Sequence, residues 1–311
     1  MNVFLHIGAH RCATTTFQDY LRQNATQLGV QGTGFWGPRR TRSGLFNGIV
    51  PAPGVNTGRD KQRRAQGRVQ LNLTRCAGLG VQQLIVSDEN MLGSVRANLR
   101  MGDLYCGVGE RMARFGAAFG GRVTDVVLSI RSLEYYWASA LGYSVTRGRR
   151  LPTPAELKRL VASRRSWRDV ITDVACAIPE ARIRVLPFET YAGRPDAQLQ
   201  AMTHLPAPRT HARLWHNATP RLPELRSLVA PEQMAALPAG DGRWQPFTPG
   251  QQLALRETYA DDLMWLTAGA DGLARLARDP DNKMVGQNLP WTDLTRGRPY
   301  DDEDRRLAGT G

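Results

Sequence analysis

Residues 3–16 read Val-Phe-Leu-His-Ile-Gly-Ala-His-Arg-Cys-Ala-Thr-Thr-Thr, and this stretch joins two different patterns. The apolar run 3–7 is typical of a buried parallel strand, and it ends at Gly8. After the threonines, apolar residues recur at helical spacing until Gly29 ends the pattern. These apolar residues are Phe17, Tyr20, Leu21 and Leu28. The segment therefore predicts a strand, a tight loop and a helix.

Three further apolar runs alternate with helical patterns along the chain. The runs cover 84–87, 123–130 and 183–186, and the expected helices cover roughly 62–77, 133–143 and 167–177. Such alternation predicts an α/β fold, a P-loop-like three-layer αβα domain whose central, mainly parallel sheet is covered on both faces. Ligands of such domains usually bind at the edge where the carboxyl ends of the strands meet.

The domain organisation follows from length and from the stretches that break this alternation. The 311 residues suit one domain over 1–290, followed by a C-terminal tail at 291–311. The segment 32–58 is rich in Gly, Pro and Arg, and we interpret 32–70 as an insert or loop on the substrate side. From Thr219 onward the pattern is helical. Its expected packing residues are Leu253, Tyr259, Leu263, Leu266 and Leu276.

Composition and charge limit the kinds of partner and the cellular location that the protein is expected to have. The formal net charge is +13, and residues 1–75 hold eleven cations and two acids, a surplus of 11 − 2 = +9. Such a surplus suits phosphate, sulfate or nucleic-acid partners, although a solubilising surface also accounts for it. No apolar run approaches the ~20 residues of a membrane span, and the start lacks the basic region of a signal peptide. We therefore expect a cytoplasmic protein with no transmembrane segment.

The loop at 8–16 has the composition of an anion cradle. A loop that enters a helix N-terminus directs backbone N–H groups at one point, and the helix dipole favours an anion there. Small residues allow a close approach, while Arg11 and three threonine hydroxyls add donors. The loop lacks the G-x-x-x-x-G-K-[ST] pattern of nucleotide triphosphatases.

This loop resembles the 5′-phosphosulfate loop of sulfotransferases that use 3′-phosphoadenylyl sulfate (PAPS). It is most similar to their bacterial branch, whose opening reads approximately H-I-G-x-H-K-T-G-T-T. The positions that match are His6, Ile7, Gly8, His10, Thr14 and Thr15, and those that depart are Arg11, Cys12 and Ala13. The resemblance implies a loop that binds PAPS through Arg11, Cys12, Ala13, Thr14, Thr15 and Thr16.

The resemblance also implies roles for the charged residues of the loop. In the family a loop lysine touches the bridging oxygen of the leaving phosphate, so Arg11 is the expected catalytic cation here. Arginine is a poor proton donor, and His10 or His6 is the candidate if the leaving group needs a proton.

A helix N-terminus lowers the pKa of a thiol, which makes Cys12 a candidate nucleophile, but no His/Asn partner pattern of a cysteine hydrolase accompanies it.

A second motif is Arg131 followed by Ser139, after the run 123–130. Eight residues are just over two helical turns, so Ser139 can lie on the helix face that begins near Arg131. In the sulfotransferase family an Arg-x7-Ser pair binds the 3′-phosphate of the cofactor, and the resemblance implies the same here. Taken alone, the pair also fits an ordinary arginine at a strand end and a serine on a helix surface.

A third motif, Ser87-Asp88-Glu89-Asn90, follows the run 84–87. It is similar to a Ser-x-Glu-Asn turn of the bacterial family members, and the resemblance implies that Glu89 is the general base on the acceptor hydroxyl. Asp88 is the alternative, because neighbouring side chains of a strand point to opposite sides. Either carboxylate could instead cap the next helix. The stretch 213–219 resembles the segment that helps to close over the cofactor.

Together these motifs predict a PAPS-dependent sulfotransferase that acts on a hydroxyl or amine of an unidentified carbohydrate, lipid or small metabolite, without a metal. Phe35, Trp36 and Phe46 could line the acceptor pocket. One alternative is a non-catalytic relative that binds PAPS or adenosine 3′,5′-bisphosphate (PAP), because Arg11 replaces the usual lysine. A P-loop-type kinase is another. A nucleic-acid binder using the arginine-rich segment 39–68 is a third, although no nucleic-acid fold signature is present.

Overall fold

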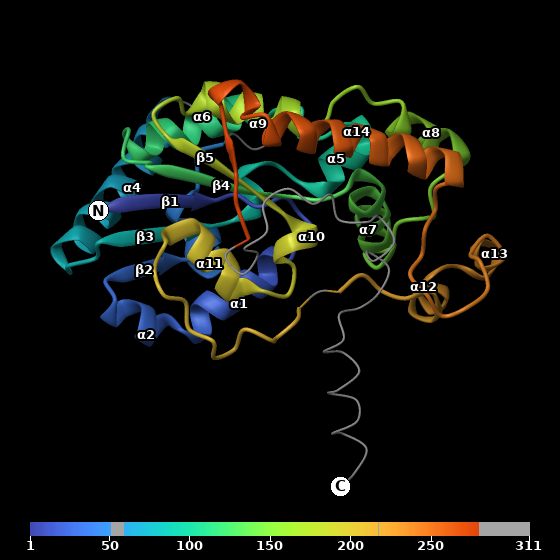
Figure 1. The fold of residues 1–311 in the computed structure, drawn as a ribbon, viewed down its shortest axis with the longest axis horizontal. Helices are drawn as coiled ribbons and strands as arrows, with labels where there is room; N and C mark the ends of the chain where they lie inside the picture. The colour runs from blue at the N-terminus through green and yellow to red at the C-terminus, as the bar shows by residue number, and fades with distance from the viewer. Residues whose placement is uncertain (51–58, 217, 280–311) are drawn as a thin grey trace, which may run out of the picture.

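The chain folds around a six-stranded sheet, described by a computed structural model for residues 1–50, 59–216 and 218–279 (Figure 1). The strand order is β2-β3-β1-β4-β5-β6, and all neighbouring strands are parallel. The strands are β1 (Asn2–His6), β2 (Thr33–Trp36), β3 (Gln83–Ser87), β4 (Asp125–Ile130), β5 (Arg182–Pro187) and β6 (Arg275–Leu276). The predicted α/β fold with a mainly parallel sheet is confirmed.

Helices cover both faces of the sheet, because successive side chains of each strand point to opposite faces. Val3 and Leu5 belong to the larger core, whereas Phe4 packs with Phe17 in the smaller one. The helices on the smaller core are α1 (Thr14–Gln23), α2 (Ala25–Val30) and α11 (Pro195–Thr203), and those on the opposite side include α4 (Arg59–Gly78), α6 (Val108–Phe119), α9 (Trp167–Ala177) and α14 (Pro249–Thr267) (Figure 1).

Shorter elements complete the larger core and the rim of the sheet. The helices are α3 (Pro38–Arg40), α5 (Val95–Met101), α7 (Leu133–Val145), α8 (Pro154–Val161), α10 (Phe188–Tyr191), α12 (Leu222–Leu228) and α13 (Pro231–Met234), and the single turns are η1 (Thr41–Leu45), η2 (Glu89–Met91) and η3 (Ala270–Gly272). In the part of the chain that the structure describes, no helix has both the length and the apolarity to cross a membrane.

The strand order creates one place where chain connections diverge. β1 lies between β3 and β4, and the chain leaves β1 toward the edge strand β2. From β4 the chain continues in the opposite direction, to β5. In open parallel sheets a ligand crevice forms outside the carboxyl ends of strands that diverge in this way. The loop after β1 and Arg131 after β4 both lie at this point.

The segment 32–58 differs from its expected irregular structure. Residues Thr33–Trp36 form β2, an edge strand paired in parallel with β3, and Trp36 is buried in the core. A four-residue strand that contains a glycine and has a single neighbour is too short to show a period of two in sequence. The adjoining residues 51–58 lie outside the described residues.

The C-terminal part is helical, as expected, but it differs in two details. The short strand β6 joins the sheet edge beside β5. Leu253 was a wrong prediction as a packing residue, because its exposed fraction is 57%. α14 buries Leu255, Tyr259 and Leu266 instead, and Leu253 lies about 200° around the helix from Leu255. The predicted tail at 291–311 lies outside the described residues.

Candidate functional site

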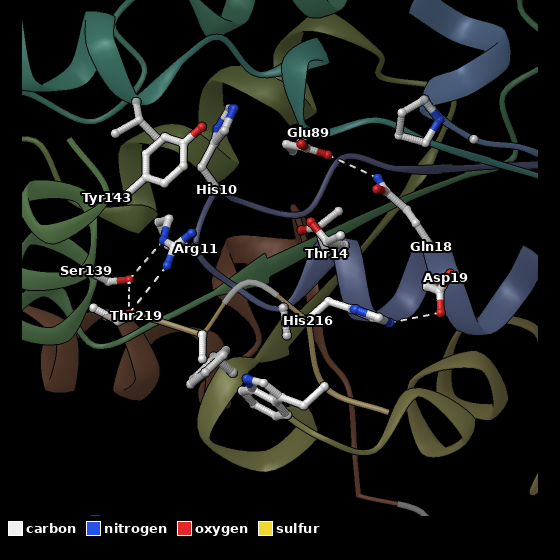
Figure 2. A pocket seen from close by; sticks show the side chains of 18 of the residues that line it. His10, Arg11, Thr14, Gln18, Asp19, Glu89, Ser139, Tyr143, His216 and Thr219 are labelled. Carbon is white, nitrogen blue, oxygen red and sulfur yellow. Dashed lines mark hydrogen bonds and ion pairs between the residues drawn. The ribbon is translucent and has the colours of Figure 1, made fainter. Parts of the chain in front are cut away.

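A cleft of about 760 Å³ opens where β1, β3 and β4 end (Figure 2). Figure 2 shows Arg11, Ser139 and Thr219 at one end of it and Glu89 and Gln18 at the other. Its lining contains eight arginines and two acids: Arg11, Arg22, Arg39, Arg40, Arg42, Arg131, Arg147, Arg243, Asp19 and Glu89. This balance of charge favours an anionic ligand.

The floor of the cleft is the loop between β1 and α1. Arg11 and Ala13 adopt left-handed backbone conformations, with φ angles of 65° and 58°, and no side chain caps the N-terminus of α1. A Cβ at Gly8 would lie 3.0 Å from both Thr14 Oγ1 and His6 Nε2, so a larger residue there would require these side chains to shift. Turns of this kind direct neighbouring N–H groups to one side and bind anions. Ala13, Thr14 and Thr15 line the cleft.

Arg131 carries a buried charge that has no carboxylate partner among the residues described by the structure. Its exposed fraction is 7%, its Nη1 donates to Arg11 O at 3.0 Å, and its Cζ lies 4.2 Å from the ring centroid of Phe188. Among the described residues its Nε has no hydrogen-bond partner. Burial lowers the pKa of Arg131. Because buried charges are normally paired, a guanidinium that lines a cleft in this state is suited to an anionic ligand.

Glu189, a carboxylate whose charge acts on this guanidinium, has other hydrogen-bond partners. Glu189 Oε1 accepts a hydrogen bond from Ser132 N at 2.9 Å, and Glu189 Oε2 accepts one from the Tyr259 hydroxyl at 2.8 Å. Burial raises the pKa of Glu189 despite these bonds. Glu189 does not line the cleft, so Arg131 presents its charge to the cleft without direct neutralisation.

Arg11 extends toward α7 and meets the second half of the predicted arginine–serine motif. Its Nε donates to Ser139 Oγ at 3.0 Å, and its Nη2 donates to Thr219 Oγ1 at 3.4 Å (Figure 2). The two hydroxyl oxygens are 2.7 Å apart. The guanidinium carbon lies 5.0 Å from the ring centroid of Tyr143. Arg11, Arg131 and Ser139 thus share one end of the cleft.

The stretch 213–219 borders the cleft. His216 N donates to Thr16 Oγ1 at 3.0 Å, and His216 Nε2 lies 2.9 Å from Asp19 Oδ2 (Figure 2). The contacts of Thr219 with Ser139 and Arg11 fasten its other end to α7. His216 therefore lies against α1, and Thr219 lies against α7.

Glu89 presents an ionised carboxylate at the other end of the cleft. Its Oε1 accepts a bond from Arg42 Nη2 at 2.9 Å, and its Oε2 accepts one from Gln18 Nε2 at 3.0 Å. Burial raises the pKa of Glu89, but the charge of Arg42 and the hydrogen bonds outweigh it, and the net pKa lies below its usual value. Glu89 therefore stays ionised at neutral pH and can accept a proton.

Asp88 is directed away from the cleft. Its exposed fraction is 2%, and it accepts hydrogen bonds from Thr41 Oγ1 at 2.5 Å, Arg42 Nη2 at 2.7 Å and Asn90 N at 3.0 Å. The last of these caps η2. Of the two carboxylates left open by the sequence, Glu89 lines the cleft, whereas Asp88 holds together the turns behind it.

The two candidate histidines occupy different places. His10 lines the cleft, and Tyr105 OH lies 2.9 Å from its Nδ1. Because that hydroxyl already accepts a bond from His10 N, it donates to Nδ1, and Nε2 carries the proton toward Asn90 Oδ1 at 3.2 Å. Burial lowers the pKa of His10, so the ring is neutral. His6 is fully buried outside the cleft with a pKa lowered by burial to about 4, which removes it as a proton donor.

Two residues of the predicted loop do not line the cleft. Cys12 faces the core with an exposed fraction of 4%, and burial raises the pKa of its thiol to about 12. A thiol in this state is no nucleophile at neutral pH. Thr16 is buried and accepts the bond from His216 N. Neither residue is part of the lining of the cleft.

Several residues that line the cleft were not predicted from the sequence, and some residues were predicted to line it that do not. Gln18 lies one helical turn after Thr14, and this spacing was the one signal that could have found it. Arg42 and Tyr143 belong to no recognisable sequence motif. Of the expected acceptor-pocket aromatics, Phe35 lines the cleft, but Trp36 and Phe46 pack in the core between β2 and α6. Trp36 is buried by this packing, whereas Phe46 is partly buried and also lines a second cavity.

Comparison of the chain with protein-family profiles, with curated proteins and with solved structures gives no match. Among the described residues, no group of three His, Cys, Asp or Glu side chains is arranged to hold a metal ion. The functional conclusion therefore depends on the geometry and charge of the cleft.

Proposed function

We propose that the protein is a sulfotransferase that takes a sulfuryl group from PAPS and transfers it to a hydroxyl or amine of an acceptor. The observation that supports it most is the buried guanidinium of Arg131, which forms no ion pair within the described part of the chain, beside an uncapped helix N-terminus in an arginine-rich cleft. Two separate anion receptors in one cleft suit a nucleotide with charged groups at both its 3′ and 5′ positions.

The residues present fit such a nucleotide. In this proposal Arg131, Ser139 and Arg11 hold the 3′-phosphate, since their donors converge at the α7 end of the cleft. The loop backbone at Ala13 and Thr14 holds the 5′ group at the N-terminus of α1. When bound, PAPS supplies an activated sulfuryl group on a phosphate leaving group.

The chemistry of the chain's own residues lies at the Glu89 end. Glu89 accepts the proton of the acceptor hydroxyl, and Arg42 and Gln18 hold the carboxylate in place. His10 stays neutral and lies beside this site, oriented by Tyr105 and Asn90. The N-terminus of α1 stabilises negative charge that develops on the leaving phosphate.

Thermal shift with PAP tests the nucleotide site without an acceptor. We expect PAP to raise the melting temperature by several degrees, and AMP, which lacks the 3′-phosphate, to raise it much less. Arg131→Ala and the milder Ser139→Ala should weaken the effect of PAP. Arg122→Ala, an exposed arginine outside the cleft, is the matched control and should keep it.

The alternatives give different results in the same experiments. Equal shifts with PAP and AMP would contradict the proposal. A larger shift with ATP and magnesium, together with phosphate transfer, would support a kinase. Single-stranded nucleic acid that binds more tightly than PAP would support a nucleic-acid binder. Release of PAP from PAPS in the presence of a panel of hydroxyl acceptors separates an enzyme from a non-catalytic relative.

A further inference from the structure

A second cavity of about 770 Å³ lies on the other side of Glu89 from the loop. Its lining contains five cations and one acid, namely Arg42, Lys61, Arg64, Arg68, Arg111 and Asp88. The single acid is already paired with Arg42 and bonded to Thr41 and Asn90. The cavity is therefore an anion-selective space that the nucleotide proposal leaves unused.

The two cavities adjoin each other through shared side chains. Arg42 lines both of them, and it bonds Asp88 Oδ1 at 2.7 Å and Glu89 Oε1 at 2.9 Å. Asn90 lines the second cavity and accepts the hydrogen bond of His10, which lines the first. A ligand that extends from the second cavity over Arg42 therefore arrives at the carboxylate of Glu89.

Apart from Arg42, the cations of the second cavity have no carboxylate partner among the described residues. Lys61 and Arg64 are exposed and have no hydrogen-bond or ion-pair partner among the described residues. Arg68 Nε is buried without a partner in the same described part, and Arg68 Nη2 donates to Asn47 O. Arg111 donates to two backbone carbonyls, and burial lowers its pKa. These groups have charge available for an anionic ligand.

Their spacing suits a ligand with repeated charges. Lys61, Arg64 and Arg68 lie three and four residues apart on one face of α4, over roughly 10 Å of helix. Arg40, on the rim of the first cleft, bonds Asn72 of the same helix at 2.6 Å and continues the row of cations. One small anion would use only a fraction of this row.

We infer that the acceptor is an acidic oligosaccharide that lies along α4 in the second cavity and presents a hydroxyl to Glu89. This inference rests on the proposed function for the role of Glu89. An oligosaccharide supplies both the repeated charges and the hydroxyl. A nucleic acid fits less well, because the aromatic rings that line the cavity, Phe46 and Phe115, pack edge to face on each other at 5.1 Å between centroids and do not form a row of stacking platforms for successive bases.

Binding of a fluorescent galacturonic acid hexamer to the full chain, without nucleotide, tests this inference. We expect binding that weakens as salt rises, and none with neutral maltohexaose. The double variant Lys61→Ala/Arg64→Ala should bind the acidic hexamer roughly three- to tenfold more weakly. Arg63→Ala/Arg122→Ala removes the same charge from exposed positions that line neither cavity, and it should bind like the unaltered protein.

The outcomes separate this inference from the nucleotide proposal. If the two double variants bind equally, or if a thymidine hexanucleotide binds more tightly than the acidic hexamer, the inference is overturned. The PAP thermal shift of Lys61→Ala/Arg64→Ala should stay unchanged, since neither residue lines the first cleft. If the acidic hexamer binds but PAP causes no thermal shift, the result supports the anion site in the second cavity and contradicts only the sulfotransferase proposal.

Discussion

Arg11 donates a hydrogen bond from Nε to Ser139 Oγ at 3.0 Å, although 128 positions separate the two residues in the chain. The bond joins the loop after β1 to α7, which follows β4, and it directs the guanidinium away from Glu89. The sequence resemblance implied that Arg11 contacts the leaving phosphate. In the structure its charge lies instead at the end of the cleft that holds Arg131.

Arg11→Ala should therefore weaken nucleotide binding as well as lower transfer. The loss of a charged hydrogen-bond donor predicts PAP affinity roughly ten- to one-hundredfold lower, measured by isothermal titration calorimetry. Transfer should fall by ~10²-fold or more, as for other preorganised charged donors. Arg147→Ala, which removes a cation stacked on the same Tyr143 ring, is a control for the local charge. Unchanged PAP affinity in Arg11→Ala would remove Arg11 from the binding site.

Glu89→Gln should remove most of the sulfuryl-transfer activity. PAP binding and the melting temperature should stay nearly unchanged, because glutamine can keep one bond to Arg42. The pKa of Glu89 is lowered, so the carboxylate is ionised above its usual value of 4.5 and loses its charge only below that value. Transfer by the unaltered enzyme should accordingly show no fall between pH 7 and 5. A fall centred near pH 6, measured with saturating PAPS, would assign the proton transfer to another group.

Asp88→Ala should destabilise the fold by roughly 2–3 kcal/mol in urea unfolding, because it leaves Thr41, Arg42 and the Asn90 amide without their buried acceptor. Asp88→Asn keeps an acceptor oxygen and should lose less. A change below about 0.5 kcal/mol in Asp88→Ala, the usual scale of surface substitutions, would show that Asp88 does not hold these turns.

Cys12 should resist alkylation in the folded protein. Its thiol is buried and its pKa is raised by that burial to about 12, whereas Cys106 and Cys176 are exposed. Iodoacetamide at pH 8, followed by peptide mass spectrometry, should label Cys106 and Cys176 first. The same treatment in urea should label Cys12 too. Rapid labelling of Cys12 in the folded protein would show that the loop opens, and Cys12 would again be a candidate nucleophile.

Local sequence was sufficient for the strands that pass through the centre of the sheet. β1, β3, β4 and β5 are apolar runs buried on both faces, so the apolar pattern in the sequence was enough to predict them as strands. β2 could not be predicted, because only its pairing with β3 makes Thr33–Trp36 a strand. Leu253 was misassigned because a helix that shows apolar residues on several faces does not reveal which face is covered.

The sequence by itself determined which residues gather at the cleft from β1 and β4, since the carboxyl ends of adjacent parallel strands meet at one edge of the sheet. It could not determine where side chains point once they arrive there. The direction of Arg11 depends on Ser139 and Thr219. Glu89 and Asp88 differ in direction because Gln18 bonds the first and Thr41 bonds the second. These partners come from distant segments, and hydrogen bonds between distant segments exist only after the sheet has brought them together.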